Sequence, residues 1–407
     1  MLKSIRGKNY RNLNQAVEFP IESLNVFIGP NGSGKSNLLE LISFLPETMA
    51  NGLHSTFKKR RSAVSVANVD KNFPQNLEIT WEFPGHPDLT FGIDLTYSLN
   101  IEIDSRGSFS VVKEVLEEKS PRYPNEPRNL KHLDFEMGKG FATPWENNRP
   151  NGLQRVETTN EDLKSAQKLA LEVLRSPGNY PVLEYVRDLL NGWRFYTAND
   201  MDIRAIKNEP IEIDPLQNHL SNDGKNLVMV LYNLFQANDH TFQDSFERVL
   251  RALYAGHRGF KFPLIDSRHF ELRWGLNPHS KDLTFDQVSD GTIRMLSWIS
   301  ILMNPNPLSL ICLDEPELGI HPAWLPILAD LIREAAKKTQ VIITTHAPSL
   351  LDEFSENVKQ VVVCGLDDFG CSQFERLDKD ELEEWHKQYR LGALFQSGHP
   401  LLGGWPK

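Results

Sequence analysis

The sequence predicts an α/β fold organised around a parallel β-sheet, and three observations support this prediction. A glycine-rich octapeptide at residues 29–36 separates a predicted strand at 24–28 from a predicted helix. Two short apolar runs, at residues 310–313 and 341–343, are typical of strands that are buried on both faces of a parallel sheet. Residues 77–116 alternate apolar and polar side chains with a period of two, which predicts an antiparallel subdomain.

The octapeptide, Gly29-Pro30-Asn31-Gly32-Ser33-Gly34-Lys35-Ser36, matches G-x-x-x-x-G-K-[ST] at every position. Its glycines allow positive φ angles, so that several backbone N–H groups can come close to a polyphosphate. The N-terminus of the following helix also directs its partial positive charge at the phosphates. Lys35 is expected to reach the β- and γ-phosphates, and the Ser36 hydroxyl to ligate Mg²⁺. We expect Pro46 to end the helix. The predicted nucleotide-binding residues are Gly29, Asn31, Gly32, Ser33, Gly34, Lys35 and Ser36.

Composition limits the location and the partners of the chain. The 407 residues are 40% hydrophobic and 24% charged. The sequence contains no run of 18 apolar residues, so we expect no membrane-spanning segment and no membrane partner. Three cysteines without C-x-x-C spacing, and an N-terminus unlike a signal peptide, favour the cytoplasm. Because the net charge is −10, any contact with DNA must come from a local basic patch. The candidate is Lys58-Lys59-Arg60-Arg61, with two hypotheses left open: a solvated loop or a phosphate-contacting site.

The chain is expected to form a single composite domain, residues 1–407, whose two ends build one α/β core. Residues 1–118 carry the phosphate-binding loop and the antiparallel β lobe. Residues 119–225 are expected to form an irregular and helical insertion, because prolines and weak apolar periodicity dominate their first part. Residues 226–407 alternate helices with apolar strands again. No heptad pattern persists over three or four repeats, which argues against a long coiled-coil arm.

Acidic residues and a histidine come directly after the two apolar runs in the C-terminal half. Asp314 ends the first run, where a carboxylate holds the Mg²⁺ shell, and Glu315 is next, where it polarises an attacking water. His346 ends the second predicted strand, 32 positions after Asp314. Upstream, Ser289-Asp290-Gly291 precedes an amphipathic helix, so Ser289 and the Gly291 backbone form an anion site at a helix N-terminus. Taken alone, this tripeptide is also compatible with a simple N-cap.

Taken in order, these motifs resemble the ABC-type ATPase heads of the SMC, RecF and OLD kind. The octapeptide then corresponds to Walker A, Ser289-Asp290-Gly291 to the ABC signature, 310–315 to Walker B, 317–322 to the D-loop and His346 to the switch histidine. The likeness is strongest to stand-alone predicted AAA-family ATPases of prokaryotic defence loci, which carry SDGT, DEPE-x-G-x-HP and TTH-[AS]-P. Further matches lie at residues 9–11, 192–196, 222–227, 391–394 and 402–404. The resemblance implies an ABC/SMC-type P-loop ATPase head with an antiparallel β subdomain and a helical insertion.

The resemblance also implies a mechanism that needs two copies of the chain. Two heads are expected to pair head to tail, as a homodimer or a higher even-numbered oligomer, around two ATP molecules. The signature residues Ser289, Asp290 and Gly291 are therefore also expected to bind the nucleotide, and Ser289 and Gly291 of one subunit would cap the γ-phosphate held by Lys35 of the other. Mg²⁺ would be held by Ser36 and Asp314. The catalytic residues would be Glu315, which activates water, and His346, which contacts the γ-phosphate.

Two departures from the family pattern bear on this mechanism. Asp290 places a carboxylate in the signature, next to the expected phosphate, so we expect ATP hydrolysis to be slow or partner-dependent. The glutamine that usually ligates Mg²⁺ has no recognisable motif, although Gln75 has a conceivable position.

The role of the ATPase is inferred from the segment beyond the switch histidine. OLD-type nucleases carry a metal-dependent Toprim domain there, whereas 61 residues come after His346 in this chain and Asp367-Asp368 lacks the required acidic constellation. We therefore expect a switch subunit of an anti-phage defence complex that controls a separately encoded effector. The alternatives are a RecF-like DNA-repair or recombination ATPase, a non-hydrolysing scaffold, and a transporter subunit, which Asp290 and the blocks around Trp193 and Asn222 fit poorly.

Overall fold

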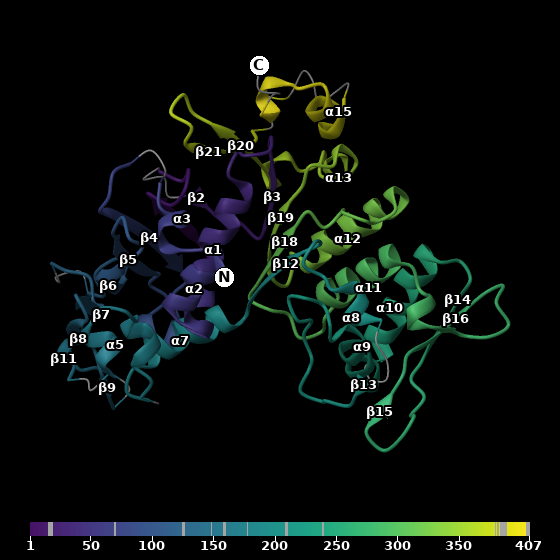
Figure 1. The fold of residues 1–407 in the computed structure, drawn as a ribbon, viewed down its shortest axis with the longest axis horizontal. Helices are drawn as coiled ribbons and strands as arrows, with labels where there is room; N and C mark the ends of the chain where they lie inside the picture. Colours follow the sequence, from purple (N-terminus) through teal and green to yellow (C-terminus); the bar gives the residue numbers. More distant parts are fainter. Residues whose placement is uncertain are drawn as a thin grey trace.

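Two large β-sheets, one antiparallel and one mostly parallel, lie on either side of helix α1 (Lys35–Asn51) (Figure 1). This arrangement confirms the predicted α/β class with an antiparallel subdomain. The computed structural model describes residues 1–14, 19–68, 71–123, 127–147, 149–157, 160–176, 178–207, 211–237, 240–378, 380, 382 and 389–403.

The antiparallel sheet has the strand order β11-β8-β7-β6-β5-β4-β1-β2 and forms the lobe at the left of Figure 1. Strands β4, β5 and β6 are the meander expected from the period-two alternation, and the inward-facing Trp81 and Tyr97 are fully buried. The strands are β1 (Ser4–Lys8), β2 (Phe19–Pro20), β4 (Gln75–Phe83), β5 (Leu95–Ile103), β6 (Phe109–Glu118), β7 (Lys131–Glu136), β8 (Lys139–Ala142) and β11 (Gln154–Arg155).

The parallel sheet has the order β12-β18-β19-β3-β20-β21, with only β21 running antiparallel to its neighbour. Strand β3, from the N-terminal part, lies between β19 and β20, so both ends of the chain contribute to one sheet. Alternate side chains of β3 enter different cores: Val26 and Ile28 on one face, Phe27 on the other. The strands are β3 (Leu24–Ile28), β12 (Trp193–Thr197), β18 (Leu310–Asp314), β19 (Gln340–Thr344), β20 (Val361–Leu366) and β21 (Ser372–Arg376).

The segment 119–225 differs from the expected irregular and helical insertion. Its first part adds β7 and β8 to the antiparallel sheet, because Leu133 and Phe135 alternate with charged residues and point into the core. Its last part contains β12, which pairs in parallel with β18 and belongs to the central sheet. The proposed boundary at residue 225 therefore separates strand β12 from strand β18, its neighbour in the parallel sheet. Pro124 and Pro177, which contributed to the expectation, lie outside the described residues.

Helix α1 continues through Pro46 to Asn51, which contradicts the expected end of the helix at this proline. An interior proline removes one helix hydrogen bond and typically costs about 3 kcal/mol. The helix persists because Leu45, Thr48 and Met49 are buried on either side of the proline. Packing between the two sheets thus outweighs the local preference.

The opposite face of the parallel sheet is covered by the helices of the C-terminal half, at the right of Figure 1. The remaining strands form small sheets: β9 (Trp145–Glu146) with β10 (Arg149–Pro150), β13 (Ile211–Glu212) with β15 (His269–Phe270), and β14 (His257–Lys261), β16 (Arg273–Leu276) and β17 (Leu283–Thr284) together. The other helices are α2 (Leu53–Lys59), α3 (Ala63–Val66), α4 (Pro87–Thr90), α5 (Glu161–Lys164), α6 (Ala170–Val173), α7 (Pro181–Asn191), α8 (Ile203–Ile206), α9 (Leu227–Gln236), α10 (His240–Leu253), α11 (Asp290–Leu302), α12 (Leu325–Ala335), α13 (Pro348–Asp352) and α15 (Leu391–Gln396). Short 3-10 turns are η1 (Phe285–Gln287), η2 (Pro322–Trp324), η3 (Val358–Gln360) and η4 (Pro400–Leu402). Among the described residues, no helix has the length and apolar character needed to cross a membrane.

Candidate active site

The glycine-rich loop between β3 and α1 folds around the Lys35 side chain. Gly29, Gly32 and Gly34 all have positive φ angles, of 144°, 82° and 100°. The Lys35 ammonium donates to the carbonyl oxygens of Gly29 and Pro30 at 2.8 and 3.0 Å, and burial lowers its pKa. The Lys35 ammonium therefore lies at the centre of the loop, held by backbone carbonyl oxygens of the loop itself.

Close packing requires glycine at the start of this loop. A Cβ added to Gly29 would lie 2.2 Å from the carbonyl oxygen of Cys364 in the neighbouring strand β20. Gly34, which caps α1, is similarly confined, because its Cβ would lie 2.0 Å from the Ser372 hydroxyl. Among the described residues, the N–H groups of Gly32, Gly34 and Lys35 have no backbone acceptor outside the helix. These donors, together with the N-terminus of α1, form a cradle for an anion.

The acidic pair lies at the end of β18, facing the loop. The Thr344 hydroxyl donates to Asp314 Oδ1 at 2.5 Å, and burial raises the pKa of Asp314, with nearby Asp200 adding to the rise. Glu315 takes a left-handed backbone conformation with a φ of 49°, and its N–H donates to the Thr344 hydroxyl at 3.1 Å. Positive φ at a residue other than glycine is strained, and such strain concentrates at functional sites.

Glu315 and His346 face each other, with 3.3 Å between Glu315 Oε1 and His346 Nε2. Burial raises the pKa of Glu315, and the charges of Asp314 and Glu317 raise it further. Burial also lowers the pKa of His346, and the Lys35 charge acts in the same direction. The arrangement thus provides a carboxylate with increased proton affinity beside an imidazole that favours its neutral form.

Glu317 is a residue of this site that the sequence analysis assigned to the D-loop but not to the catalytic or binding residues. Its Oε1 accepts hydrogen bonds from the Thr345 hydroxyl at 2.6 Å and from the backbone N–H groups of His346 and Ala347 at 3.0 and 3.3 Å. The carboxylate therefore fixes the loop that carries His346 to the turn after Glu315. The second glutamate of the sequence Asp-Glu-Pro-Glu is the only local signal for it.

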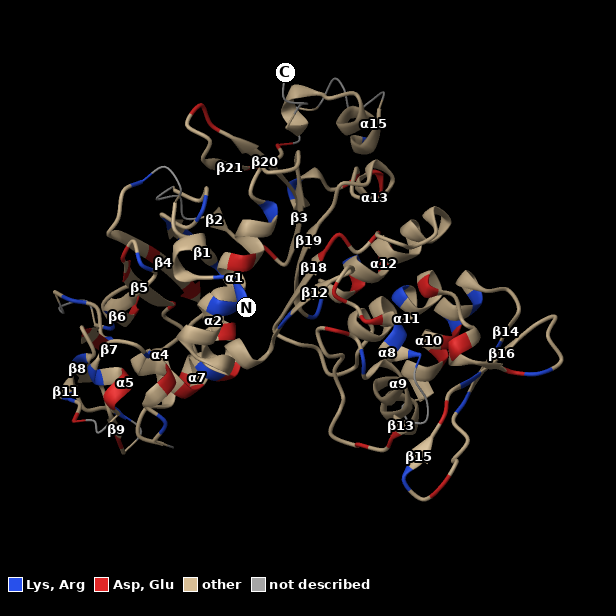
Figure 2. Ribbon diagram, in the orientation of Figure 1, with Lys and Arg blue, Asp and Glu red and all other residues tan. Residues whose placement is uncertain are grey.

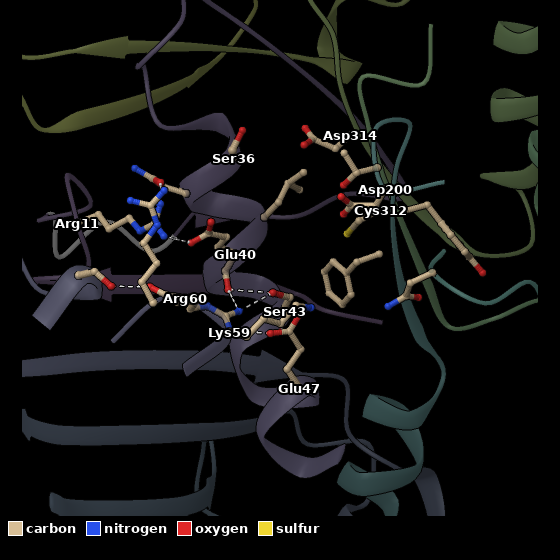
Figure 3. A pocket seen from close by; sticks show the side chains of 18 of the residues that line it. Arg11, Ser36, Glu40, Ser43, Glu47, Lys59, Arg60, Asp200, Cys312 and Asp314 are labelled. Atoms are coloured by element: carbon tan, nitrogen blue, oxygen red, sulfur yellow. Dashed lines mark hydrogen bonds and ion pairs between the residues drawn. The ribbon is translucent and has the colours of Figure 1, made fainter. Parts of the chain in front are cut away.

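A cleft of about 900 Å³ opens between α1 and the strands β12 and β18 (Figure 3). Ser36, Asp200 and Asp314 lie together toward one end of this cleft. Two carboxylates and a hydroxyl are the oxygen donors that Mg²⁺ prefers, so these residues fit a magnesium ion. Asp200 comes shortly after β12 and was not predicted, because no motif surrounds it and only the pairing of β12 with β18 brings it to Asp314.

Gln75, the conceivable magnesium ligand, is occupied elsewhere. Its side-chain amide donates to the carbonyl oxygens of Asn68 and Lys71 and accepts from the Asn68 N–H at 3.0 Å. It is buried at the start of β4 and does not line the cleft. Asp200, rather than Gln75, lines the cleft together with Ser36 and Asp314.

The signature residues lie apart from this group, at the N-terminus of α11. Ser289 is the N-cap, and its hydroxyl accepts from the Thr292 N–H at 3.3 Å. Ser289, Asp290 and Gly291 do not line the cleft that contains Asp314. Lys35 lies near Asp314, Glu315 and His346. Among the described residues, no hydrogen bond or ion pair joins Ser289, Asp290 or Gly291 to these groups, and Gly291 packs against the backbone of Gly319 in the segment after Glu315.

The Asp290 carboxylate, which we expected to disfavour a phosphate, forms an ion pair. Lys207, which directly follows α8, approaches Asp290 Oδ1 to 2.8 Å. The Asp290 side chain is 69% exposed and Lys207 is 24% exposed. No local pattern indicates this pair, since 83 positions separate the two residues.

The basic cluster at residues 58–61 is not a solvated loop. Lys58 and Lys59 end helix α2, and the Arg60 side chain is buried against α1. The Arg60 guanidinium donates to Glu47 at 2.5 Å and to the Ser43 hydroxyl, and Lys59 pairs with the same Glu47 at 2.8 Å. Figure 2 shows these basic residues beside acidic segments of α1. Glu47 therefore compensates part of this charge within the chain, while the Lys58 and Arg61 side chains are exposed.

This fold and arrangement define the class of protein as a P-loop ATPase head of the ABC/SMC type. The structure is similar to that of an SmcHead solved with the C-winged helix domain of ScpA, with a TM-score of 0.55 and 16% identity over 94% of this chain and 99% of that chain. An Smc head domain with a coiled coil and joint derived from Pyrococcus yayanosii has a TM-score of 0.50 and 12% identity over 95% and 99% of the two chains.

The family is shown by a profile described as "AAA domain, putative AbiEii toxin, Type IV TA system", which matches residues 24–352. The chain belongs to this family. It is 22% identical over 389 residues to a Retron Vc95 probable ATPase from Vibrio cholerae serotype O1 biovar El Tor, covering 88% of this chain and 73% of the relative. Shorter matches are a Septu protein PtuA from Bacillus thuringiensis, 34% identical over 14% of each chain, and a DNA replication and repair protein RecF from Chlorobium phaeobacteroides (strain BS1), 28% identical over 25% of each chain.

Proposed function

We propose that the chain binds and hydrolyses ATP with Mg²⁺ and forms one half of an ATP-dependent dimer. The observation that carries this proposal is the division of the site. Lys35, Asp314 and Glu315 share one end of the parallel sheet, whereas Ser289 caps helix α11 and, among the described residues, has no hydrogen bond to any of them. A second copy placed head to tail would bring its own Ser289 and Gly291 to the γ-phosphate.

The roles of the residues are derived from their geometry. Lys35 and the N–H groups of the loop bind the β- and γ-phosphates. Mg²⁺ held by Ser36, Asp200 and Asp314 would neutralise phosphate charge. Water attacks the γ-phosphorus, the bond to the bridging oxygen breaks, ADP leaves, and Glu315 takes the proton of the water.

A Glu315→Gln variant tests the dimer, because it retains the hydrogen-bonding shape of the side chain and removes the base. We expect this variant to form a stable dimer with ATP and Mg²⁺, measured by size-exclusion chromatography with light scattering, while the wild type cycles. Lys35→Ala in the same background is the matched control and should stay monomeric. A Glu315→Gln chain that stays monomeric with ATP would refute the composite site.

A mixing experiment tests whether the signature acts on the nucleotide of the other subunit. Lys35→Ala keeps an intact signature, and Ser289→Arg keeps an intact phosphate loop, so neither chain alone builds a complete site. Their mixture contains heterodimers with one complete site, and we expect ATP-dependent dimers to form in the Glu315→Gln background. A mixture no better than either chain alone would show that the signature acts within its own subunit.

We further propose that this dimer is a cytoplasmic switch that controls a separately encoded effector in a prokaryotic anti-phage defence complex. The support is the similarity to a retron ATPase over most of the chain and to a Septu protein over a shorter stretch. Expression of the native operon with a tag on this chain tests the role. We expect a neighbouring gene product to co-purify, with retention that differs between the ATP-bound Glu315→Gln form and the Lys35→Ala form. Failure to retain any neighbouring product would contradict the effector role.

A RecF-like DNA-binding ATPase is the second candidate, because one quarter of the chain is similar to a RecF protein. It requires DNA binding that ATP stimulates and that weakens with rising salt. Fluorescence anisotropy with duplex DNA at low salt distinguishes it from the effector switch. The absence of binding with and without ATP would exclude it.

A further inference from the structure

The signature serine is the end of a chain of three hydroxyl groups. The Thr292 and Ser289 hydroxyl oxygens are 2.7 Å apart, and the Tyr254 hydroxyl is 2.5 Å from that of Thr292. Ser289 also accepts the Thr292 N–H at 3.3 Å. Tyr254 directly follows helix α10, so the chain of hydroxyls connects the signature to a part of the molecule 35 positions earlier in the sequence.

Aromatic packing fixes the position of Tyr254. Its ring makes edge contacts with Trp274 and Trp324, with centroid separations of 5.0 and 5.2 Å. Trp274 is fully buried and its indole N–H donates to His257 at 2.7 Å. Trp324 belongs to the turn η2, which begins at Pro322, the last residue of the D-loop segment. Tyr254 therefore lies between the signature, the D-loop and the β14–β16 sheet.

The number of available protons favours one direction for the two hydrogen bonds, in which Tyr254 donates to Thr292 and Thr292 donates to Ser289. Each hydroxyl has one proton to donate and can accept two hydrogen bonds. Among the described residues, Thr292 is the only hydrogen-bonding partner that the Tyr254 hydroxyl has, so its proton is used only if Tyr254 donates. Thr292 then donates to Ser289. The Ser289 oxygen is thereby filled by the N–H and the O–H of Thr292.

When both acceptor positions of the Ser289 hydroxyl oxygen are occupied, the hydroxyl can form a further hydrogen bond only by donating its proton. A phosphate oxygen only accepts hydrogen bonds, so it is bound by a hydroxyl that presents a proton and repelled by one that presents a lone pair. The relay from Tyr254 thus sets Ser289 in the state that an anion requires. The reverse direction would leave the Tyr254 proton without a protein acceptor among the described residues and turn a Ser289 lone pair toward the phosphate.

We propose that Tyr254 is a positioning residue for the signature: through Thr292 it fixes Ser289 as a hydrogen-bond donor to the γ-phosphate held by a second copy of this chain. The inference rests on the proposed composite site. It also links the D-loop to the signature, because Trp324 contacts the same tyrosine ring. Tyr254 does not touch the nucleotide and acts only through Thr292.

The experiment measures the ATP concentration that gives half-maximal dimer in the Glu315→Gln background. Tyr254→Phe removes the hydroxyl and keeps the ring against both tryptophans, and we expect the required ATP concentration to rise about 5- to 10-fold, as for the loss of one hydrogen bond. Thr292→Val should have at least the same effect, whereas Thr292→Ser, which retains the hydroxyl, should resemble the parent. Tyr254→Phe combined with Thr292→Val should be no worse than Thr292→Val alone, because both interrupt one chain of hydroxyls.

Two controls separate the relay from a general loss of stability. Tyr185→Phe removes a hydroxyl that donates to the Pro84 carbonyl oxygen at 2.9 Å in the antiparallel lobe, and should leave dimer formation unchanged. The monomeric Tyr254→Phe chain should bind a fluorescent ATP analogue with the same affinity as the parent monomer. An unchanged ATP requirement for Tyr254→Phe, or additive effects of the two substitutions, would overturn the relay. If the parent Glu315→Gln chain itself fails to dimerise, the composite site is refuted and the relay with it.

Discussion

Replacement of Lys207 by methionine removes the ammonium that pairs with Asp290 and retains most of the apolar side chain. The consequence for stability should be small, because both groups reach solvent, and exposed ion pairs contribute about 0.2–1 kcal/mol. The consequence for ATP-driven dimerisation should be larger. In the proposed dimer, Asp290 without Lys207 would place an uncompensated negative charge near the γ-phosphate of the other subunit.

The size of this effect depends on the separation of the charges. For a separation of about 6 Å in the proposed dimer, two like charges would repel by about 0.7 kcal/mol at the dielectric constant of water and by about 3 kcal/mol at an effective value of 20. Lys207→Met should therefore raise the ATP concentration for half-maximal dimer by about 3- to 100-fold. The increase should shrink with added salt, because exposed charges are screened.

A double-mutant cycle in the Glu315→Gln background checks this expectation. Asp290→Asn combined with Lys207→Met removes both charges and should restore dimer formation to within about twofold of the parent. Light scattering measures the dimer, and thermal unfolding monitors the fold. Failure of Asp290→Asn to rescue Lys207→Met would refute the role of charge repulsion. A melting temperature of Lys207→Met low enough to account for the loss of dimer would refute it as well.

Three further predictions concern the loop, the basic helix and a buried acid. Gly29→Ala should weaken ATP binding about tenfold or more in calorimetric titrations, since its Cβ would lie 2.2 Å from the Cys364 carbonyl oxygen, and an unchanged affinity would contradict this. Arg60→Met should lower the free energy of unfolding in urea by about 2–4 kcal/mol, because the buried guanidinium pairs with Glu47. The control Lys58→Ala should lower it by about 0.5 kcal/mol or less, and equal losses for the two variants would argue against the buried role of Arg60. Burial raises the pKa of Glu114 from 4.5 to about 7, so the folded chain binds a proton at this carboxyl more tightly than the unfolded chain does. The stability contributed by the protonated Glu114 is therefore complete below pH 4.5 and declines as the pH rises toward 7. Glu114→Gln should flatten the dependence of the melting temperature on pH in that window, and an unaltered slope would be the contrary result.

The parts of the site that local patterns encode could be predicted from the sequence. The phosphate loop needs glycines at fixed spacing, and Asp314 and His346 come at or just after the ends of short apolar strands, so these residues are visible without a structure. The α/β class is predicted by the same runs. Roles assigned to these residues stay predictions until the variants are measured.

The residues that were missed are placed by tertiary neighbours. Asp200 reaches the cleft only because β12 pairs with β18, and Lys207 reaches Asp290 across 83 positions. Strands β7 and β8 were missed because they are short, charged between their apolar residues, and stabilised by pairing with the edge of an existing sheet. Pro46 was misjudged because burial of α1 between two sheets outweighs the preference of one residue.

The left-handed backbone of Glu315 sets stability against function at one position. A φ of 49° costs a glutamate of order 1 kcal/mol that a glycine would not lose. Glu315→Gly should therefore relieve local strain while removing the carboxylate beside His346. The backbone is therefore strained at the position where the chain carries this carboxylate. The rest of the fold must hold Glu315 in a backbone conformation that a glutamate alone would avoid.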